Sequence, residues 1–359
     1  MANPGQVPEA VERVAASLLR WCGDAKAARL FWEQRPHPTP EALAERLGID
    51  PADRPARLTH ARLRAAEAVQ RAAAGRIEVT TAGDPGYPGL LSRIVDPPIA
   101  LWARGDSAVL DRPAVAVVGS RRPSPAGRAI AGRLGQDLAR AGLVVVSGLA
   151  RGIDAAAHEG ALRGGGCTVG VLGSGVDVVY PPEHADLAAR LLRTGCLVSE
   201  LPPGTEPLPH HFPLRNRLIS GLSLAVVVVE AADKSGSLIT ARMALEQGRS
   251  VCAVPGNVVS GCYQGCHALI KDGARLVETV EDVLEELRWV SSGSGTCQPD
   301  KSHFINGLLA VMRAGVPVSV DHLADTTGRT GLDVLTELGR LEVAGQVERT
   351  AGGLFVRLD

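Results

Sequence analysis

The sequence has few aromatic side chains, no strong excess of charge and no long apolar run. Aromatic residues make up 3% of the chain, which argues against an extended platform for stacked bases. The formal net charge is −1, so any site for a polyanion has to be a local basic patch. The longest aliphatic run, LAVVVV at 224–229, is far too short to span a membrane.

Signals for export, disulfides and metals are also missing. The seven cysteines are scattered, several of them in apolar strand-like runs where a thiol behaves as a small hydrophobic group. The first residues, MANPGQVPEAVERV, lack the positive stretch and apolar core of a signal peptide. CYQGCH at 262–267 has one residue too many between its cysteines for haem attachment, and no further ligands complete a zinc site. We therefore expect a cytoplasmic protein with no metal, no cofactor and no contact with a membrane.

Three regions and a linker follow one another along the chain. Residues 1–76 have helical periodicity and predict an N-terminal helical domain of the SAM or helix-hairpin-helix kind. Residues 289–302 are rich in serine and glycine and predict a linker. Residues 303–359 predict a winged helix: a helix from Ile305 to Met312, helices over 319–328 and 329–345, and a hairpin that turns around 351–353.

The central region, residues 77–288, alternates β-branched runs with helical stretches. Strands that are apolar on both faces and alternate with helices indicate a parallel sheet covered on both sides. We expect a doubly wound, Rossmann-like α/β domain, whose ligands bind beyond the carboxyl ends of the strands. The predicted strands are 115–119, 143–147, 168–172, 196–199, 225–230 and 250–254, and the predicted helices are 126–141, 152–163, 183–193 and 237–248.

Two turns between a strand and a helix carry glycine and serine. In VAVVGSRRPSPAGR, at 115–128, the free N–H groups and the dipole of the helix attract anions, and Arg121 or Arg122 adds a cation. VVVSGLARGIDAAAH, at 144–158, repeats the arrangement. Asp154 and His158 share a helix face there. They form either an acid–base pair, or a carboxylate that caps the helix beside a histidine packed on the loop.

Two further segments offer cations and hydroxyl groups. In HFPLRNRLISGLS, at 211–223, two arginines flank Asn216 and no acid occurs between 207 and 221. We expect an exposed loop that runs into a helix and acts as a phosphate clamp or as a solvated basic surface. In VVVVEAADKSGSLITARMALEQGR, at 226–249, serine hydroxyls stand beside free N–H groups before a helix. Neither a Walker loop nor a GxGxxG turn is present.

Taken in order, these motifs resemble the DNA-processing protein (DprA or Smf) family. The resemblance covers nearly 190 residues, more than half of the chain. Ser120 stands where threonine is frequent, His267 where asparagine is frequent, and Leu214 where some members carry a basic residue. The motifs that carry the resemblance are GYPGLLSRIVDPPIALWARG, GSRRPSPAGR, SGLARGIDAAAH, VLGSGVDVVYP, LVSELPPG, HFPLRNRLISGLS, EAADKSGSLITARMALEQGR, VPGNVVSG and GCHALIKDGA.

The resemblance implies a protein that binds and carries out no catalysis. It implies binding and protection of single-stranded DNA, homodimerisation through the Rossmann-like domain, and loading of the recombinase RecA on the strand during natural transformation. Lys234 joins the site by its position, and Phe212 is either a stacking surface for a base or a buried anchor. Carried over by position, the DNA-binding residues are Gly119, Ser120, Arg121, Ser147, Gly148, Arg215, Asn216, Arg217, Ser235, Gly236 and Ser237.

Two other functions stay open. A phosphoribohydrolase-type enzyme shares such a sheet, and Glu200 and Glu230 stand near strand ends as candidate acids, but the PGGxGTxxE signature of those enzymes is absent. A nucleotide-sensing transcriptional regulator would read duplex DNA with its winged helix. Segment 329–345 carries three acids against two arginines, a poor match to phosphate, so we expect an auxiliary or protein-contact role for that domain.

Overall fold

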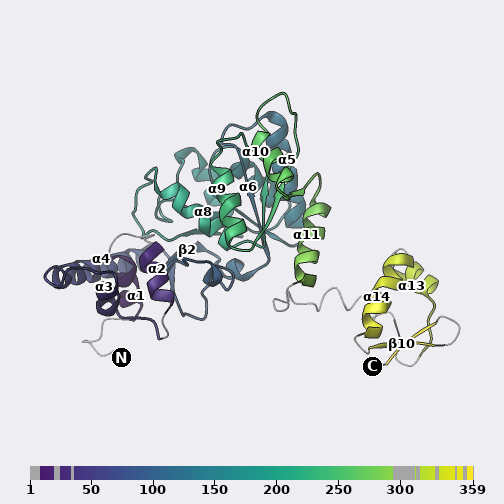
Figure 1. The fold of residues 1–359 in the computed structure, drawn as a ribbon, viewed down its shortest axis with the longest axis horizontal. Coiled ribbons are helices and arrows are strands. Elements are labelled where there is room, and N and C mark those ends of the chain that lie inside the picture. Colours follow the sequence, from purple (N-terminus) through teal and green to yellow (C-terminus); the bar gives the residue numbers. More distant parts are fainter. Residues whose placement is uncertain are drawn as a thin grey trace. The chain divides into compact units, whose positions relative to one another are not determined.

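The computed structural model describes residues 9–19, 25–33, 36–293, 312, 316–327, 331–343, 346–350 and 354–358. They belong to two compact units, Met1–Gly293 and Ser294–Asp359. The first unit holds both the helical N-terminal region and the sheet (Figure 1). The domain boundaries expected from the sequence stay predictions.

The first unit is built on one sheet with the strand order β1-β2-β6-β5-β4-β3-β7-β8-β9. Neighbours from β6 to β9 pair in parallel, whereas β1 and β2 pair with each other antiparallel, and β2 pairs antiparallel with β6. All six strands expected from the sequence are present, and the doubly wound fold is confirmed. The strands are β1 Ile77–Thr81, β2 Ala100–Gly105, β3 Ala114–Val118, β4 Val144–Ser147, β5 Thr168–Val171, β6 Cys196–Ser199, β7 Ala225–Val228, β8 Ser250–Ala253 and β9 Arg275–Leu276.

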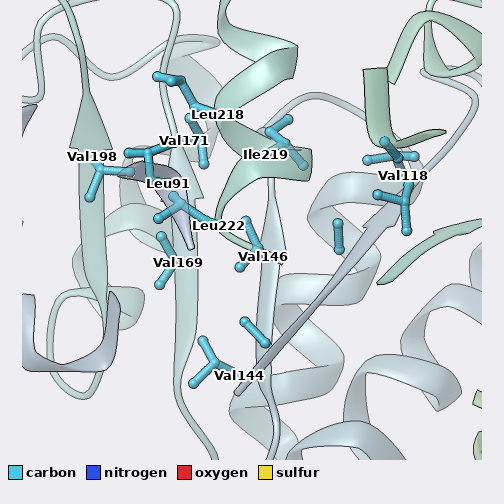
Figure 2. Close-up of a cluster of buried hydrophobic side chains, with 14 of the residues drawn as sticks. Leu91, Val118, Val144, Val146, Val169, Val171, Val198, Leu218, Ile219 and Leu222 are labelled. Atoms are coloured by element: carbon cyan, nitrogen blue, oxygen red, sulfur yellow. The ribbon is translucent and has the colours of Figure 1, made fainter. Parts of the chain in front are cut away.

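Helices cover both faces of this sheet because successive strand side chains point to opposite faces. Val115 and Val117 of β3 pack with α5, α6 and α11, whereas Ala116 and Val118 pack with α8, α9 and α10. Figure 2 shows the second face, where leucine and isoleucine side chains of α8 lie over valines of the central strands. The helices are α5 Pro125–Arg140, α6 Ile153–Arg163, α7 Ala185–Leu191, α8 His211–Gly221, α9 Ser237–Glu246, α10 Gln264–Lys271 and α11 Val280–Gly293.

The winding direction reverses between β3 and β7. From β3 the chain passes through α5 on one face to β4, and from β7 it passes through α9 on the other face to β8. The two connections therefore diverge from neighbouring strand ends, which leaves a crevice at this point of an open α/β sheet.

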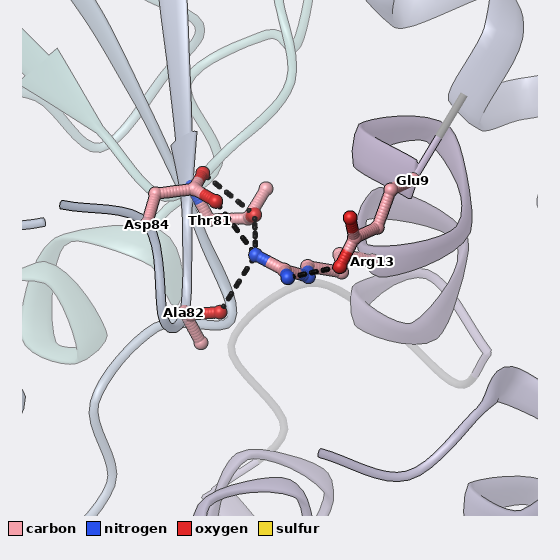
Figure 3. A network of polar contacts seen from close by, with 5 residues as sticks. All are labelled: Glu9, Arg13, Thr81, Ala82 and Asp84. Atoms are coloured by element: carbon pink, nitrogen blue, oxygen red, sulfur yellow. Dashed lines mark hydrogen bonds and ion pairs between the residues drawn. The ribbon is translucent and has the colours of Figure 1, made fainter. Parts of the chain in front are cut away.

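Among the described residues, four helices precede the sheet and lie beside β2 (Figure 1). Trp102 of β2 is fully buried among their side chains. Arg13 of α1 fastens them to the turn after β1 (Figure 3). Its Nη1 donates to Thr81 Oγ1 at 3.1 Å, to the Ala82 carbonyl at 3.1 Å and to Asp84 Oδ1 at 2.6 Å, and Nη2 donates to Glu9. These helices are α1 Glu9–Ser17, α2 Ala25–Trp32, α3 Pro40–Arg46 and α4 Arg54–Ala74.

The second unit contains α13 Val320–Thr327, α14 Gly331–Val343 and a hairpin of β10 Val347–Arg349 with β11 Phe355–Arg357. Its core includes Met312, Leu323, Leu338 and Phe355. The first predicted helix of this unit, apart from Met312, and the predicted turn at 351–353 lie outside the described residues. In the first unit, α11 extends to Gly293 and so occupies the first residues of the predicted linker.

Candidate nucleic-acid interface

A pocket of about 530 Å³ lies at the carboxyl ends of β3, β4 and β7, at the point where the winding reverses. Seven of the twelve residues predicted for the site line it: Gly119, Arg121, Arg215, Asn216, Ser235, Gly236 and Ser237. The other lining residues were not predicted for the site, apart from the stacking role considered for Phe212: Val118, Ala150, Asp154, Tyr180, Pro209, Phe212, Pro213, Ile219, Ile239 and Thr240.

A cation and two aromatic rings form one side of the pocket. Arg121 is exposed, and its guanidinium carbon lies 5.5 Å from the centroid of the Phe212 ring. The Phe212 ring is tilted against Tyr180, with 5.4 Å between the ring centroids. A cation over an aromatic face suits a nucleotide, because the ring can stack on a base while the guanidinium holds a phosphate.

Arg215 is a buried cation at the wall of the pocket. Its Nη1 donates to the Gly148 carbonyl at 2.7 Å and to the Val171 carbonyl. Burial lowers the pKa of Arg215 to about 10 although the nearby Asp154 carboxylate raises it, so the guanidinium stays charged at neutral pH. Gly148 makes this placement possible, since a Cβ there would collide with the guanidinium.

Asp154 and His158 do not form an acid–base pair. The N–H groups of Gly148 and Ala150 donate to Asp154 Oδ2 at 3.0 Å and 3.4 Å. His158 is fully buried, with Nδ1 2.7 Å from Thr168 Oγ1. The second interpretation holds only in that both residues are structural: the carboxylate holds the loop before α6 and does not cap the helix, and the histidine contacts β5.

Acid is expected to destabilise the protein through His158. Burial, with help from His184 and Arg215, lowers the pKa of His158 from 6.5 to about 3. The unfolded chain therefore binds the proton first, so this contribution is fully present above about pH 6.5 and falls by up to about 1.4 kcal/mol per unit below it. Urea unfolding between about pH 7 and pH 5 measures this slope. His158→Asn, which keeps a donor near Thr168, is expected to reduce this dependence of the free energy of unfolding on pH. Equal slopes in the variant and the unaltered protein would contradict the assignment of the effect to His158.

The start of α9 supplies hydroxyl groups. Ser235 Oγ and Ser237 Oγ lie 2.7 Å apart, and both residues line the pocket beside Gly236. The helix begins at Ser237, so the positive end of its dipole lies at the pocket wall, while the N–H groups of Leu238 and Ile239 donate to the Ser235 and Gly236 carbonyls within the turn. Hydroxyl groups beside the positive end of a helix dipole can hold an anion.

The other predicted residues lie outside the pocket lining. Ser147 is buried and its Oγ donates to the Val117 carbonyl at 2.6 Å. The N–H of Ser120 donates to the Glu230 carbonyl at 2.7 Å. Lys234 is exposed next to the pocket segment 235–237. Ser147 and Ser120 therefore hold the loops in place, as does Gly148 through Asp154.

The prediction of an exposed loop at 211–223 is wrong, because residues His211–Gly221 form α8. Pro213 fits the first turn of a helix, where its missing N–H has no partner to lose. Residues two apart on a helix point about 200° away from each other. Arg215 and Arg217 therefore face different surroundings, and only Arg215 lines the pocket.

Arg217 forms a buried ion-pair cluster. Its Nη2 donates to both carboxylate oxygens of Glu200 at 2.7 Å and 2.8 Å, and its Nε lies 3.2 Å from Asp96 Oδ2. The Arg217 side chain is 5% exposed, so it is not available to a ligand in this structure.

The two candidate acids of an enzyme have structural partners. Glu200 belongs to the Arg217 cluster. Glu230 accepts from the Ser124 N–H at 3.0 Å and 3.1 Å and from Ser124 Oγ at 2.6 Å, and Ser124 caps α5. Neither carboxylate is part of the pocket lining. Within the described ranges, no cluster of three histidine, cysteine, aspartate or glutamate side chains is arranged to hold a metal ion.

Comparison with known proteins assigns the chain to a family. The family model for DNA recombination-mediator protein A matches residues 78–288, which is more than half of the chain. The chain belongs to this family. A second model, the DprA winged helix domain, matches residues 306–353. The winged-helix prediction for the C-terminal domain is thereby confirmed.

Relatives in other bacteria support the assignment. The chain is 44% identical to the Smf protein of Escherichia coli over 282 residues, which cover 76% of this chain and 75% of that protein. It is 47% identical to the DNA processing protein DprA of Streptococcus pneumoniae over 206 residues, covering 57% and 73%. Members of this family are DNA-processing proteins, and the chain is one of them.

Two solved structures share the fold. The Streptococcus pneumoniae DprA structure superposes with a TM-score of 0.66 at 35% identity, covering 78% of this chain and 99% of that chain. A Helicobacter pylori DNA processing protein A structure, described for its single-stranded DNA binding mode, gives 0.53 at 29% identity and covers 59% and 97%. In the described part of the chain, no helix combines the length and apolar character that a membrane span requires.

Proposed function

We propose that this chain binds single-stranded DNA in the pocket between β3, β4 and β7. The observation that carries the proposal is the convergence of two arginines, a helix N-terminus, two serine hydroxyls and an aromatic ring on one pocket of about 530 Å³. The single-stranded DNA binding mode described for the Helicobacter pylori relative supports the same ligand.

Each part of the pocket has a role in this proposal. Arg121, exposed at the wall, holds a phosphate of the strand. The serine hydroxyls at the start of α9, helped by the dipole of that helix, hold a second anionic oxygen. A base stacks on Phe212 and Tyr180, which accepts every base because each has an aromatic face. Little sequence preference follows from this arrangement.

Arg215 and the remaining predicted residues support the site. The Arg215 guanidinium adds positive charge at the wall of the pocket while two carbonyls fix its position. Lys234 adds charge at the rim, and Ser120, Ser147 and Gly148 fix the loops that carry the contacts. Arg217 acts on the strand only through the stability of α8.

Binding, rather than catalysis, is the proposed activity. Glu200 and Glu230, the candidate acids, are both engaged in structural contacts away from the pocket lining. Release of free base from nucleotides by purified protein at an enzyme-like rate would overturn this part of the proposal.

The proposal extends to partners through the family. Relatives named DprA and the match to a recombination-mediator model support a role in DNA recombination. We propose that the protein works in the cytoplasm as a homodimer joined through the Rossmann-like domain. There it protects incoming single strands and loads RecA on them during natural transformation. If RecA filaments grow faster on single-stranded DNA when the protein is present than when it is absent, this role is supported. An unchanged rate of filament growth would argue against it.

A titration tests the ligand directly. Single-stranded and duplex DNA of equal length are titrated at several salt concentrations. We expect at least about tenfold tighter binding of the single strand, with log K falling by about 0.7 per phosphate contact as log salt rises. Equal affinity for single-stranded and duplex DNA, or an affinity that does not fall as the salt concentration rises, would contradict the proposal that the pocket binds single-stranded DNA.

A further inference from the structure

Three exposed arginines of α4 form a stripe that the pocket does not include. Arg57, Arg64 and Arg71 are seven residues apart, so they lie within about 40° of one another on the helix and about 10 Å apart along it. Each is exposed. We call these three residues the basic stripe. Glu67 lies beside the stripe on the helix, and Asp177 lies at the Gly204 turn that Arg71 contacts, so the three guanidinium groups still outnumber the carboxylates near them.

These arginines differ from the arginine that holds the helix in place. Arg62, on the opposite side of α4, donates to Glu12 from Nε and Nη2, both at 2.8 Å, and to Glu41 from Nη2. The basic stripe has no such role, because none of its members forms an ion pair with a described residue. Its charges remain available to a ligand.

The stripe continues into the segment that leads to the pocket. Arg71 lies against Gly204, where a Cβ would collide with its guanidinium and where φ is +82°. The Gly204 N–H donates to Asp177 Oδ1 at 2.7 Å, which fixes this turn. Pro209, five residues further along, lines the pocket. At most about 18 Å of extended chain therefore separates the end of the stripe from the pocket wall.

We propose that the basic stripe of α4 holds the phosphates of a single strand beyond the nucleotides that occupy the pocket. The inference rests on the proposed function, since it takes the strand in the pocket as its starting point. A flexible polyanion that leaves the pocket beside Pro209 meets Arg71 first, and then Arg64 and Arg57 two and four turns further along the helix. The N-terminal helical region thereby lengthens the binding footprint.

Oligonucleotide length separates this inference from the pocket itself. The full chain is titrated with oligothymidylates of about 6 and about 40 nucleotides, the shorter one sized for the pocket alone. In Arg57→Gln/Arg64→Gln, which leaves the Gly204 contact intact, we expect about tenfold weaker binding of the long strand. The salt slope for that strand should shrink by about 1.4, which is about 0.7 for each lost phosphate contact. Binding of the short strand should not change.

Matched controls keep the result interpretable. Arg140→Gln/Arg193→Gln removes the same charge near the amino ends of β4 and β6, away from the pocket, and should leave both affinities unchanged. Arg71→Gln should also weaken binding of the long strand without changing binding of the short strand. If Arg57→Gln/Arg64→Gln bound the long strand with unchanged affinity and the short strand normally, the proposed role of the basic stripe would be overturned. The proposed role of the pocket would not be affected. Failure of the unaltered protein to bind either strand would overturn both.

Discussion

Replacing Arg217 by methionine is expected to lower the free energy of unfolding by about 3–5 kcal/mol. The change removes the cation that pairs with Glu200 and Asp96 inside the protein, which leaves buried carboxylate charge without a partner. The thermal midpoint should fall by about 10 °C. Urea or thermal unfolding measures the loss, and DNA affinity, measured where the variant is folded, should stay close to that of the unaltered protein.

Two comparison variants isolate the cause of this loss. Arg193→Met removes an exposed arginine of the same size and should change stability by no more than about 0.5 kcal/mol. Arg217→Met/Glu200→Gln also removes the Glu200 carboxylate charge that has lost its partner, and should recover part of the lost free energy of unfolding. If Arg217→Met kept full stability and instead bound DNA much more weakly, the arginine would be a DNA contact, and α8 would have to turn a different face to the pocket.

Replacing Arg121 by alanine is expected to weaken binding of single-stranded DNA by about tenfold to a hundredfold at low salt. Arg121 is exposed at the pocket wall over the Phe212 ring, so its loss removes a charged phosphate contact without opening the core. Fluorescence titration of a labelled oligothymidylate at several salt concentrations measures the affinity. The salt slope should decrease by about 0.7 for one lost contact.

The neighbouring arginine provides the control for this result. Arg122 is also exposed but does not line the pocket, so Arg122→Ala should have a clearly smaller effect. Both variants should unfold at the same urea concentration as the unaltered protein. If Arg121→Ala bound single-stranded DNA as tightly as the unaltered protein, Arg121 could not be the main phosphate contact of the pocket.

The central sheet could be predicted because its strands are apolar on both faces. Val115, Val117 and the valines of β7 are buried on either side, so their sequence runs are continuous and distinct from the helices between them. β1 lacked this signal, since it pairs antiparallel at the edge of the sheet and only its two end residues are buried. The two-residue β9 is too short to recognise.

Residues that line the pocket could be predicted where glycine and serine turns follow strands, but not where long-range contacts determine the position of a side chain. Arg121 and the serines before α9 are local features, and the structure brings them to one pocket. The burial of Arg217 depends on its ion pairs with Asp96 and Glu200, which are distant in the sequence, so no local pattern indicates it. Once α8 is recognised as a helix, however, the two-residue spacing separates Arg215 from Arg217.

Cross-linking would locate the strand most directly. An oligothymidylate that carries a photoreactive iodinated uracil is irradiated with the full chain, and the attached peptides are identified by mass spectrometry. The pocket predicts attachment at Tyr180 or Phe212, the two rings at its wall, and loss of that attachment in Arg121→Ala. Attachment confined to the unit Ser294–Asp359, with neither ring modified, would contradict the proposal that the pocket of the Rossmann-like domain binds the strand.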